Sequence, residues 1–227
     1  GNGAADAFGA GETDNTVIGA NAMGSMDEGS GQVDQNIAIG ANALLGKDIG
    51  GSSTAIVDNI AIGTQAMDSG SIGAQTGTVA IGAQSLGALT SGAGNLAVGY
   101  TALSACTTGA KNLAIGDEAL NAMVEGGGNV AIGHEAMKGA NHADCDNNIA
   151  IGANAMDGIS TNGAGWNIGI GADALGAALT GDNNVAIGQA AGGAVTSGAS
   201  NTMLGYGAGT AVAQGSRNIA IGAYAME

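Results

Sequence analysis

The sequence predicts an all-β fold, a repetitive parallel β-solenoid (β-roll) of about 12 coils of 17–23 residues each, assembled as a homotrimeric fibre. Three observations predict it. One short motif recurs twelve times, the distances between its copies change in steps of two residues, and 45 glycines occur together with 45% hydrophobic residues and no proline. Because one such coil cannot bury its own apolar side chains, stacked neighbours have to complete its core.

The motif reads Asn-aliphatic-Ala-Ile-Gly-x-x-Ala-(Met/Leu), as in NIAIGANAL from Asn36. Its first position is asparagine in eleven copies: Asn15, Asn36, Asn59, Asn95, Asn112, Asn129, Asn148, Asn167, Asn184, Asn201 and Asn218. Thr78 occupies this position in the remaining copy. Its turn position is always glycine: Gly19, Gly40, Gly63, Gly82, Gly99, Gly116, Gly133, Gly152, Gly171, Gly188, Gly205 and Gly222.

The spacing between successive motif glycines is always odd, and 17 residues is the commonest value. A strand turns its side chains to the opposite face at every residue, so a one-residue slip would exchange inside and outside. Insertions of two residues preserve the facing. A helical repeat has no reason to respect this parity, so the spacing favours strands.

Each motif strand has two uncharged faces. Ile37, Ile39 and Ala41 share one face, and Asn36, Ala38 and Gly40 share the other. We expect each coil to consist of this motif strand, a glycine turn, a second short strand and a glycine-rich return. The β-branched residues, which favour strands, should stack inside the coil. The face of Asn, Ala and Gly then needs a partner, which predicts packing against other copies of the chain and hence a homotrimer.

The asparagines have two structural interpretations. In stacked coils they would form a ladder in which each amide binds the next. Alternatively they serve in turns, since asparagine tolerates left-handed backbone. Neither interpretation gives them a catalytic or ligand-binding role.

Charge excludes several classes of partner. The net charge is −15, with four basic residues, so no basic patch for nucleic acid can be built. No apolar run is long enough for a transmembrane helix, and we expect no membrane insertion. The two cysteines, Cys106 and Cys145, lie two coils apart, which is too far for a disulfide.

Few residues suggest chemistry, and we expect no catalytic residues and no cofactor. The weak candidates for a metal site are His134, His142, Asp144, Cys145 and Asp146, whose spacing matches no zinc pattern. Acidic loop residues such as Asp27, Glu28 and Asp182 allow an incidental Ca²⁺. Glu118 and Glu135 share a column and form a carboxylate pair of the kind that glycosidases use, but surface acids are common in so acidic a chain.

Exposed aromatic residues often form sugar-binding platforms. The aromatic residues of this chain are few and scattered: Phe8, Tyr100, Trp166, Tyr206 and Tyr224. They indicate at most a weak glycan site.

The motif, together with ALSACTTGAKNLAIG from Ala102 to Gly116, resembles the GNxNxAIGxxAL…TTG repeats in tail fibres of bacteriophages and other viruses. It is similar, more distantly, to the head repeats of trimeric autotransporter adhesins, whose period is shorter. The resemblance covers about residues 15–226. It implies a homotrimeric fibre that contacts a host or a surface, and it supplies no catalytic motif.

We therefore expect an N-terminal segment or incomplete coil at residues 1–14 and one twelve-repeat solenoid at residues 15–227. The expected function is that of a non-enzymatic structural fibre segment of an extracellular appendage, at a cell surface or on a virion. It would mediate attachment to a glycan or protein receptor, and the long linkers at residues 24–35 and 45–58 are candidate contact surfaces. The alternative is a subunit of a self-assembling filament that stacks head to tail through uncapped coil ends.

Overall fold

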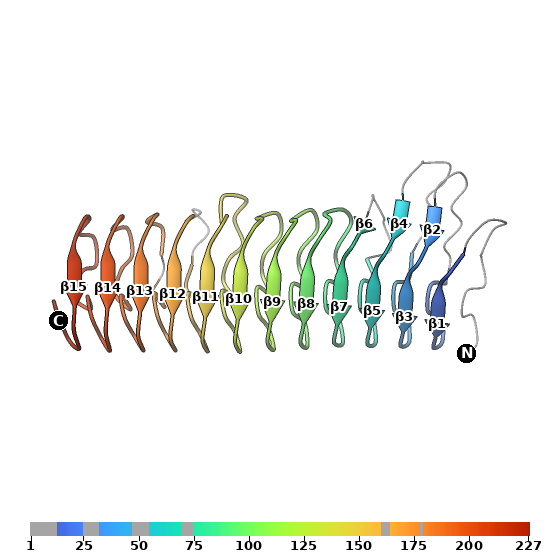
Figure 1. Cartoon of the computed structure of the whole chain (residues 1–227), viewed down its shortest axis with the longest axis horizontal. Helices are drawn as coiled ribbons and strands as arrows, with labels where there is room; N and C mark the ends of the chain where they lie inside the picture. Colours follow the sequence, from blue (N-terminus) through green and yellow to red (C-terminus); the bar gives the residue numbers. More distant parts are fainter. Residues whose placement is uncertain (1–12, 25–31, 47–54, 70–74, 160–163, 178) are drawn as a thin grey trace. The chain divides into compact units, whose positions relative to one another are not determined.

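The computed structural model describes residues 13–24, 32–46, 55–69, 75–159, 164–177 and 179–227. The chain divides into two compact units, Gly1–Asn112 and Leu113–Glu227. In each unit, short parallel strands lie side by side and are joined by turns (Figure 1). The described residues contain no helix. The predicted all-β parallel solenoid is confirmed.

The first unit pairs its motif strands in parallel and in register, for example Ile37 with Ile60 and Ile39 with Ile62. These strands are β1 (Thr16–Ile18), β3 (Ile37–Ile39), β5 (Ile60–Ile62), β7 (Val79–Ile81) and β8 (Leu96–Val98). Equivalent motif positions therefore form columns that run from coil to coil.

The second unit repeats this arrangement. Its strands are β9 (Leu113–Ile115), β10 (Val130–Ile132), β11 (Ile149–Ile151), β12 (Ile168–Ile170), β13 (Val185–Ile187), β14 (Thr202–Leu204) and β15 (Ile219–Ile221). Each of the twelve motifs thus forms one strand. The chain completes one turn of the solenoid between one motif strand and the next, so a unit has one turn fewer than it has motif strands. The five strands of the first unit and the seven of the second therefore make about ten complete turns.

A second parallel sheet occurs in the first unit, in the longer coils. It consists of β2 (Gln32–Asp34), β4 (Ala55–Val57) and β6 (Gln75–Thr76). We had expected a second strand after the glycine turn of every coil. In the described residues this position holds turns instead.

The turn that follows each motif glycine has an unusual backbone. The second and fourth residues after the glycine have positive φ, for example Asn42 at 56° and Leu44 at 49°. This conformation is unfavourable for a leucine. Hydrogen bonds between coils offset the cost: the Asn42 amide donates to the Ala20 carbonyl of the preceding coil (2.9 Å), and the Leu44 amide donates to the Ala66 carbonyl of the next (2.8 Å).

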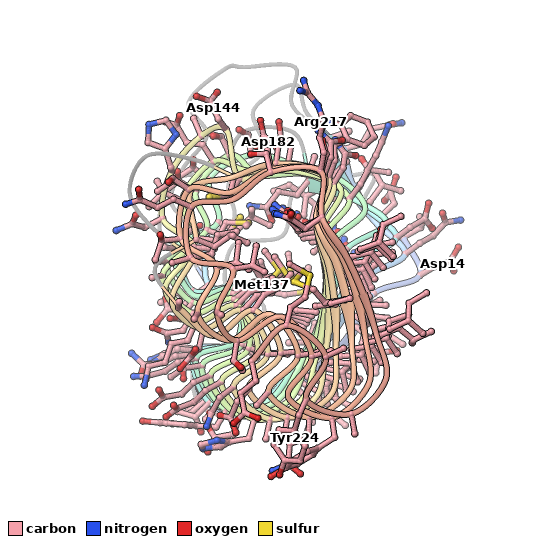
Figure 2. All side chains as sticks on the ribbon, turned by 90° about the vertical axis from the view of Figure 1, so that its left-hand side faces the viewer. Asp14, Met137, Asp144, Asp182, Arg217 and Tyr224 are labelled. Atoms are coloured by element: carbon pink, nitrogen blue, oxygen red, sulfur yellow. The ribbon has the colours of Figure 1, made fainter. Side chains whose placement is uncertain are left out.

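The expected orientation of the motif strand is wrong. Asn36 and Ala38 are fully buried inside the coil, whereas Ile37 and Ile39 are only half-buried and point outward. The interior is filled from the opposite wall by leucine and methionine at the fourth position after the glycine, such as Met137 (Figure 2).

The reason for this orientation is the thinness of the coil. A Cβ built on Gly169, at the centre of β12, would lie 2.9 Å from Cγ of Met156. Where the turn directs a Leu or Met inward, space remains for only small or flat side chains along the inner face of the strand, and the branched aliphatic residues lie outside. Met203 of β14 is buried on this face because the turn positions opposite it are glycines, Gly192 and Gly209.

Several expectations concern residues outside the described ranges. Most of the expected N-terminal segment falls there, as do Phe8, Asp27 and Glu28 and the central parts of both long linkers.

Candidate functional site

The outer face of the motif strands is the most prominent surface feature of both units. It carries two columns of side chains, from the first and third residues of each strand. In the first unit nine of these ten residues are Ile, Leu or Val, and in the second unit thirteen of fourteen are. The exceptions are Thr16 and Thr202, and no position is charged.

These aliphatic side chains remain accessible to solvent. Ile81 in the first unit is 37% exposed, and Ile187 and Leu204 in the second are 38% and 44% exposed. A continuous exposed apolar surface of this kind marks an interaction site in a soluble protein. We call these two columns the aliphatic face. Sequence alternation reveals that the strand has two faces, but it does not show which of them points outward.

The motif asparagines line the interior as a hydrogen-bonded column. The Asn148 backbone amide (2.9 Å) and its side-chain Nδ2 (3.2 Å) both donate to Oδ1 of Asn129 in the preceding coil. Nδ2 also donates to the Ala164 carbonyl in the next coil (2.7 Å). Oδ1 of Asn148 in turn accepts from the Asn167 backbone amide (3.0 Å). The amides thus satisfy buried backbone groups, which is a structural use.

The column changes at Thr78, where a hydroxyl replaces the amide. Thr78 still donates its backbone amide to Oδ1 of Asn59 (3.0 Å), but its own Oγ1 has no hydrogen-bond partner among the described residues. Gln75, three residues earlier, points inward and donates Nε2 to the Leu89 carbonyl (2.6 Å). Its Oε1 is likewise unpartnered in the described part of the chain. Gln75 replaces only part of what an asparagine would supply.

The motif glycines are required by the stacking of backbone on backbone. All twelve have φ between 116° and 144°, a region that side-chain-bearing residues rarely occupy. A Cβ on Gly152 would also lie 2.6 Å from the carbonyl carbon of Gly171 in the next coil. The glycines therefore permit close approach between coils.

The candidate metal ligands do not converge. Cys145 is fully buried, whereas His134 is exposed and lies 3.8 Å from the Glu135 carboxylate. Nδ1 of His142 lies 3.4 Å from Oδ2 of Asp144, and Oδ1 of Asp146 accepts the Gly127 amide (2.6 Å). Within the described ranges, no three His, Cys, Asp or Glu residues are grouped as a metal site requires.

The paired carboxylates of Glu118 and Glu135 share one lysine. Nζ of Lys138 contacts Oε2 of Glu118 and lies 3.1 Å from Oε1 of Glu135. The hydrogen bonds that the Lys138 ammonium donates to these two carboxylates raise its pKa. An ammonium group held between two partly exposed carboxylates has the character of a surface ion-pair network.

Both cysteines are buried, and neither forms a disulfide. Burial raises the pKa of Cys106 to about 11, because the thiolate would lose its solvation. The Cys106 thiol donates a hydrogen bond to the Gly109 carbonyl. A thiol with a raised pKa is a poor nucleophile at neutral pH. Cys106 is therefore a core residue.

Two tyrosines on successive coils form a pair that the sequence pattern did not reveal. The rings of Tyr206 and Tyr224 make an edge-to-face contact with 5.1 Å between centroids, and both are exposed. Tyr224 lies on the outer side of the turn (Figure 2). The two residues occupy different motif positions, so comparison of equivalent positions alone misses the contact.

Within the ranges that the structure describes, we find no helix with the length and apolar character needed to span a membrane.

Comparison of this chain with protein-family models, with curated proteins and with solved structures finds no match.

Proposed function

We propose that this chain is a non-enzymatic structural segment of an extracellular fibre, and that the fibre is a homotrimer held together through the aliphatic face. The observation that carries the proposal is the two columns of almost entirely aliphatic side chains that each unit presents on the outside of its coils. The sequence resemblance to tail fibres and adhesin heads agrees with it. The interface is thus the large-residue face, not the small-residue face that the sequence suggested.

The physical argument is one of desolvation. The aliphatic face carries no charge, so burying it requires no charged group to lose its hydration, and each buried methylene contributes roughly 0.8 kcal/mol. Three copies arranged around a threefold axis can each direct one such face inward and form a closed apolar core. The charge of −15 then remains on the loops and turns, where it keeps the fibre soluble.

Attachment is the second part of the proposal. A shaft of stacked coils holds loops at fixed positions on its surface, and loops carry binding residues on rigid scaffolds. We place the protein on a cell surface or a virion, as part of a viral tail fibre or a surface adhesin, with a glycan or a protein as its receptor.

The native mass of the purified chain, measured by light scattering, tests the trimer. We expect about 64 kDa, three times the chain mass of 21.3 kDa. A double variant, Ile132→Glu and Ile151→Glu, places two charges on the aliphatic face and should reduce the mass to that of one chain.

The matched control is His134→Glu with Ala153→Glu, which adds the same residues at exposed turn positions of the same two coils. This control should retain the trimer mass. A wild-type chain of 21.3 kDa would contradict the proposal. Long polymers that persist in the Ile132→Glu, Ile151→Glu variant would instead favour head-to-tail stacking into a filament.

A further inference from the structure

The single tryptophan of the chain lies on the surface, where packing does not require it. Trp166 is 63% exposed and directly precedes the ladder residue Asn167. The equivalent positions in the two adjacent coils are Asn147 and Asn183, which are polar. The Trp166 backbone amide donates to the Asp146 carbonyl (3.0 Å), so the coil holds the residue in place while its ring remains accessible.

The tryptophan lines a cavity of about 410 Å³ within the second unit. The other side chains that line it are Asp144, Asp146, Asn147, Thr180 and Asp182. Asp144 and Asp182 project from the loop side of the coil (Figure 2). None of these residues belongs to the aliphatic face, so formation of a trimer does not require the cavity to be covered.

Two of the three carboxylates are fixed by backbone amides of a neighbouring coil. Oδ1 of Asp146 accepts the Gly127 amide (2.6 Å), and Oδ1 of Asp182 accepts the Gly165 amide (2.9 Å). Asp144 is more exposed and contacts His142. No lysine or arginine is among the described residues that line the cavity. The cavity therefore combines three negative groups, an aromatic ring and a hydroxyl.

We infer that this cavity binds an organic ammonium group, either a quaternary ammonium or the protonated amine of an amino sugar. The carboxylates attract a cation and repel anionic ligands. The face of an indole is the best aromatic partner for a cation, and its flat apolar surface suits the carbon atoms attached to the nitrogen. The hydroxyl of Thr180 and the amide of Asn147 supply hydrogen-bonding groups that an amino sugar needs and a quaternary ammonium does not. This inference goes beyond the proposed fibre function and does not depend on it.

Trp166 provides the readout, because it is the only tryptophan and its fluorescence reports on its own surroundings. Tetramethylammonium and glucosamine are titrated separately into the full chain at low, constant ionic strength. We expect a saturable change in fluorescence with a dissociation constant on the order of millimolar. A response to both probes indicates a general ammonium site, and a stronger response to glucosamine assigns the sugar as the source.

Variants and blanks test the assignment. Asp144→Asn, which removes a carboxylate not bonded to the backbone of another coil, should weaken binding roughly threefold to tenfold. Asp117→Asn removes an exposed carboxylate outside the cavity and should leave binding unchanged. Trp166→Leu, followed by calorimetry instead of fluorescence, should weaken binding by about tenfold.

Three results would overturn the inference: no saturable response, an equal response to sodium chloride, or an equal response to uncharged glucose. The last would show that the ring stacks on a sugar without any need for the ammonium group. A wild-type chain that binds ammonium but is not a trimer would refute only the proposed assembly. A trimer that binds no ammonium would refute only the ammonium site.

Discussion

The inner and outer faces of each motif strand differ in how well their residues tolerate substitution, although inner and outer residues are neighbours in the sequence. Asn148 and Ala150 of one coil point inward and are completely buried, whereas Ile149 and Ile151 point outward and are half-buried. The inner face is restricted by stacked backbone and by polar groups that have no access to water. The outer face is restricted only by its neighbours in the column and, in the proposed trimer, by the partner chains. The difference indicates that, along the motif strand of so thin a coil, the small inner residues tolerate substitution less than the large outer ones.

The largest effect should come from a side chain that prevents the backbones of neighbouring coils from packing closely. Gly152→Ala places a Cβ 2.6 Å from the carbonyl of Gly171 and forces alanine into a φ of 137°. We expect a loss of at least about 4 kcal/mol in the free energy of unfolding, measured by denaturant titration. Gly77→Ala is the matched control, because φ is 62° and no atom lies within 4 Å of its added Cβ. That variant should cost only about 1 kcal/mol, and equal costs would refute the role of backbone contact.

Breaking the amide column should have the next largest effect. Asn148→Ala leaves the Ala164 carbonyl and the Asn167 amide without their partner in the interior. We expect a loss of about 3 kcal/mol in the free energy of unfolding, since each buried unsatisfied group costs about 1–3 kcal/mol.

The comparison for this variant is Ile149→Ala, the adjacent residue on the outer face. In the separated chain it should cost about 1 kcal/mol, because its side chain is only half-buried. If the outer substitution were the more harmful of the two in a chain that does not trimerise, the assignment of inside and outside would be wrong.

A pH titration examines the interior without a steric change. Burial raises the pKa of Cys106 from 9.0 to about 11, so between these values the unfolded chain ionises while the folded chain does not. The contribution of Cys106 to stability is therefore complete below pH 9 and is lost as pH rises towards 11. The loss is about 2–3 kcal/mol.

Cys106→Ala should remove this alkaline loss, so the free energies of unfolding of wild type and variant should converge between pH 9 and pH 11. Other groups that titrate in this range affect both proteins alike. A difference that stays constant over the range would show that the thiol is not desolvated in the folded state.

The smallest effect should be a gain, from repair of the amide column. Thr78→Asn supplies the missing amide, and Gln75→Val removes the side chain that now occupies part of the space. Val33 and Ile56 hold the equivalent position in the two preceding coils. In the second sheet, Val33 pairs with Ile56, and Ile56 pairs with Gln75.

We expect the double variant to gain about 1 kcal/mol in the free energy of unfolding, because it removes two unpartnered buried oxygens and the introduced amide can take over the Leu89 carbonyl, which loses its Gln75 donor. Thr78→Asn alone should gain less, since Gln75 remains in the interior. A double variant no more stable than wild type would mean that buried water already satisfies these groups.

The sequence by itself determined the repeat, the strand at each motif and the parallel register. The constant motif and the odd spacing were sufficient, because parallel stacking of equivalent coils is the arrangement in which every motif meets a copy of itself. The glycines and the asparagines were recognisable as structural for the same reason. The second strand was predicted in the wrong place: a turn follows the glycine, and the second sheet of β2, β4 and β6 lies directly before the motif strands of the longer coils.

Only the tertiary structure decided which face lies inside. Alternation along Asn36–Gly40 shows two faces, but both are uncharged, so hydrophobicity alone favoured the isoleucines as the core. The deciding quantity is the width of the coil, which depends on the turn after the glycine and on the Leu or Met that this turn directs inward. That width leaves room for alanine and asparagine on the strand and places the isoleucines outside. Likewise, Trp166, Asp144 and Asp182 come from three successive coils. Residues so far apart in the sequence become neighbours only when the coils stack.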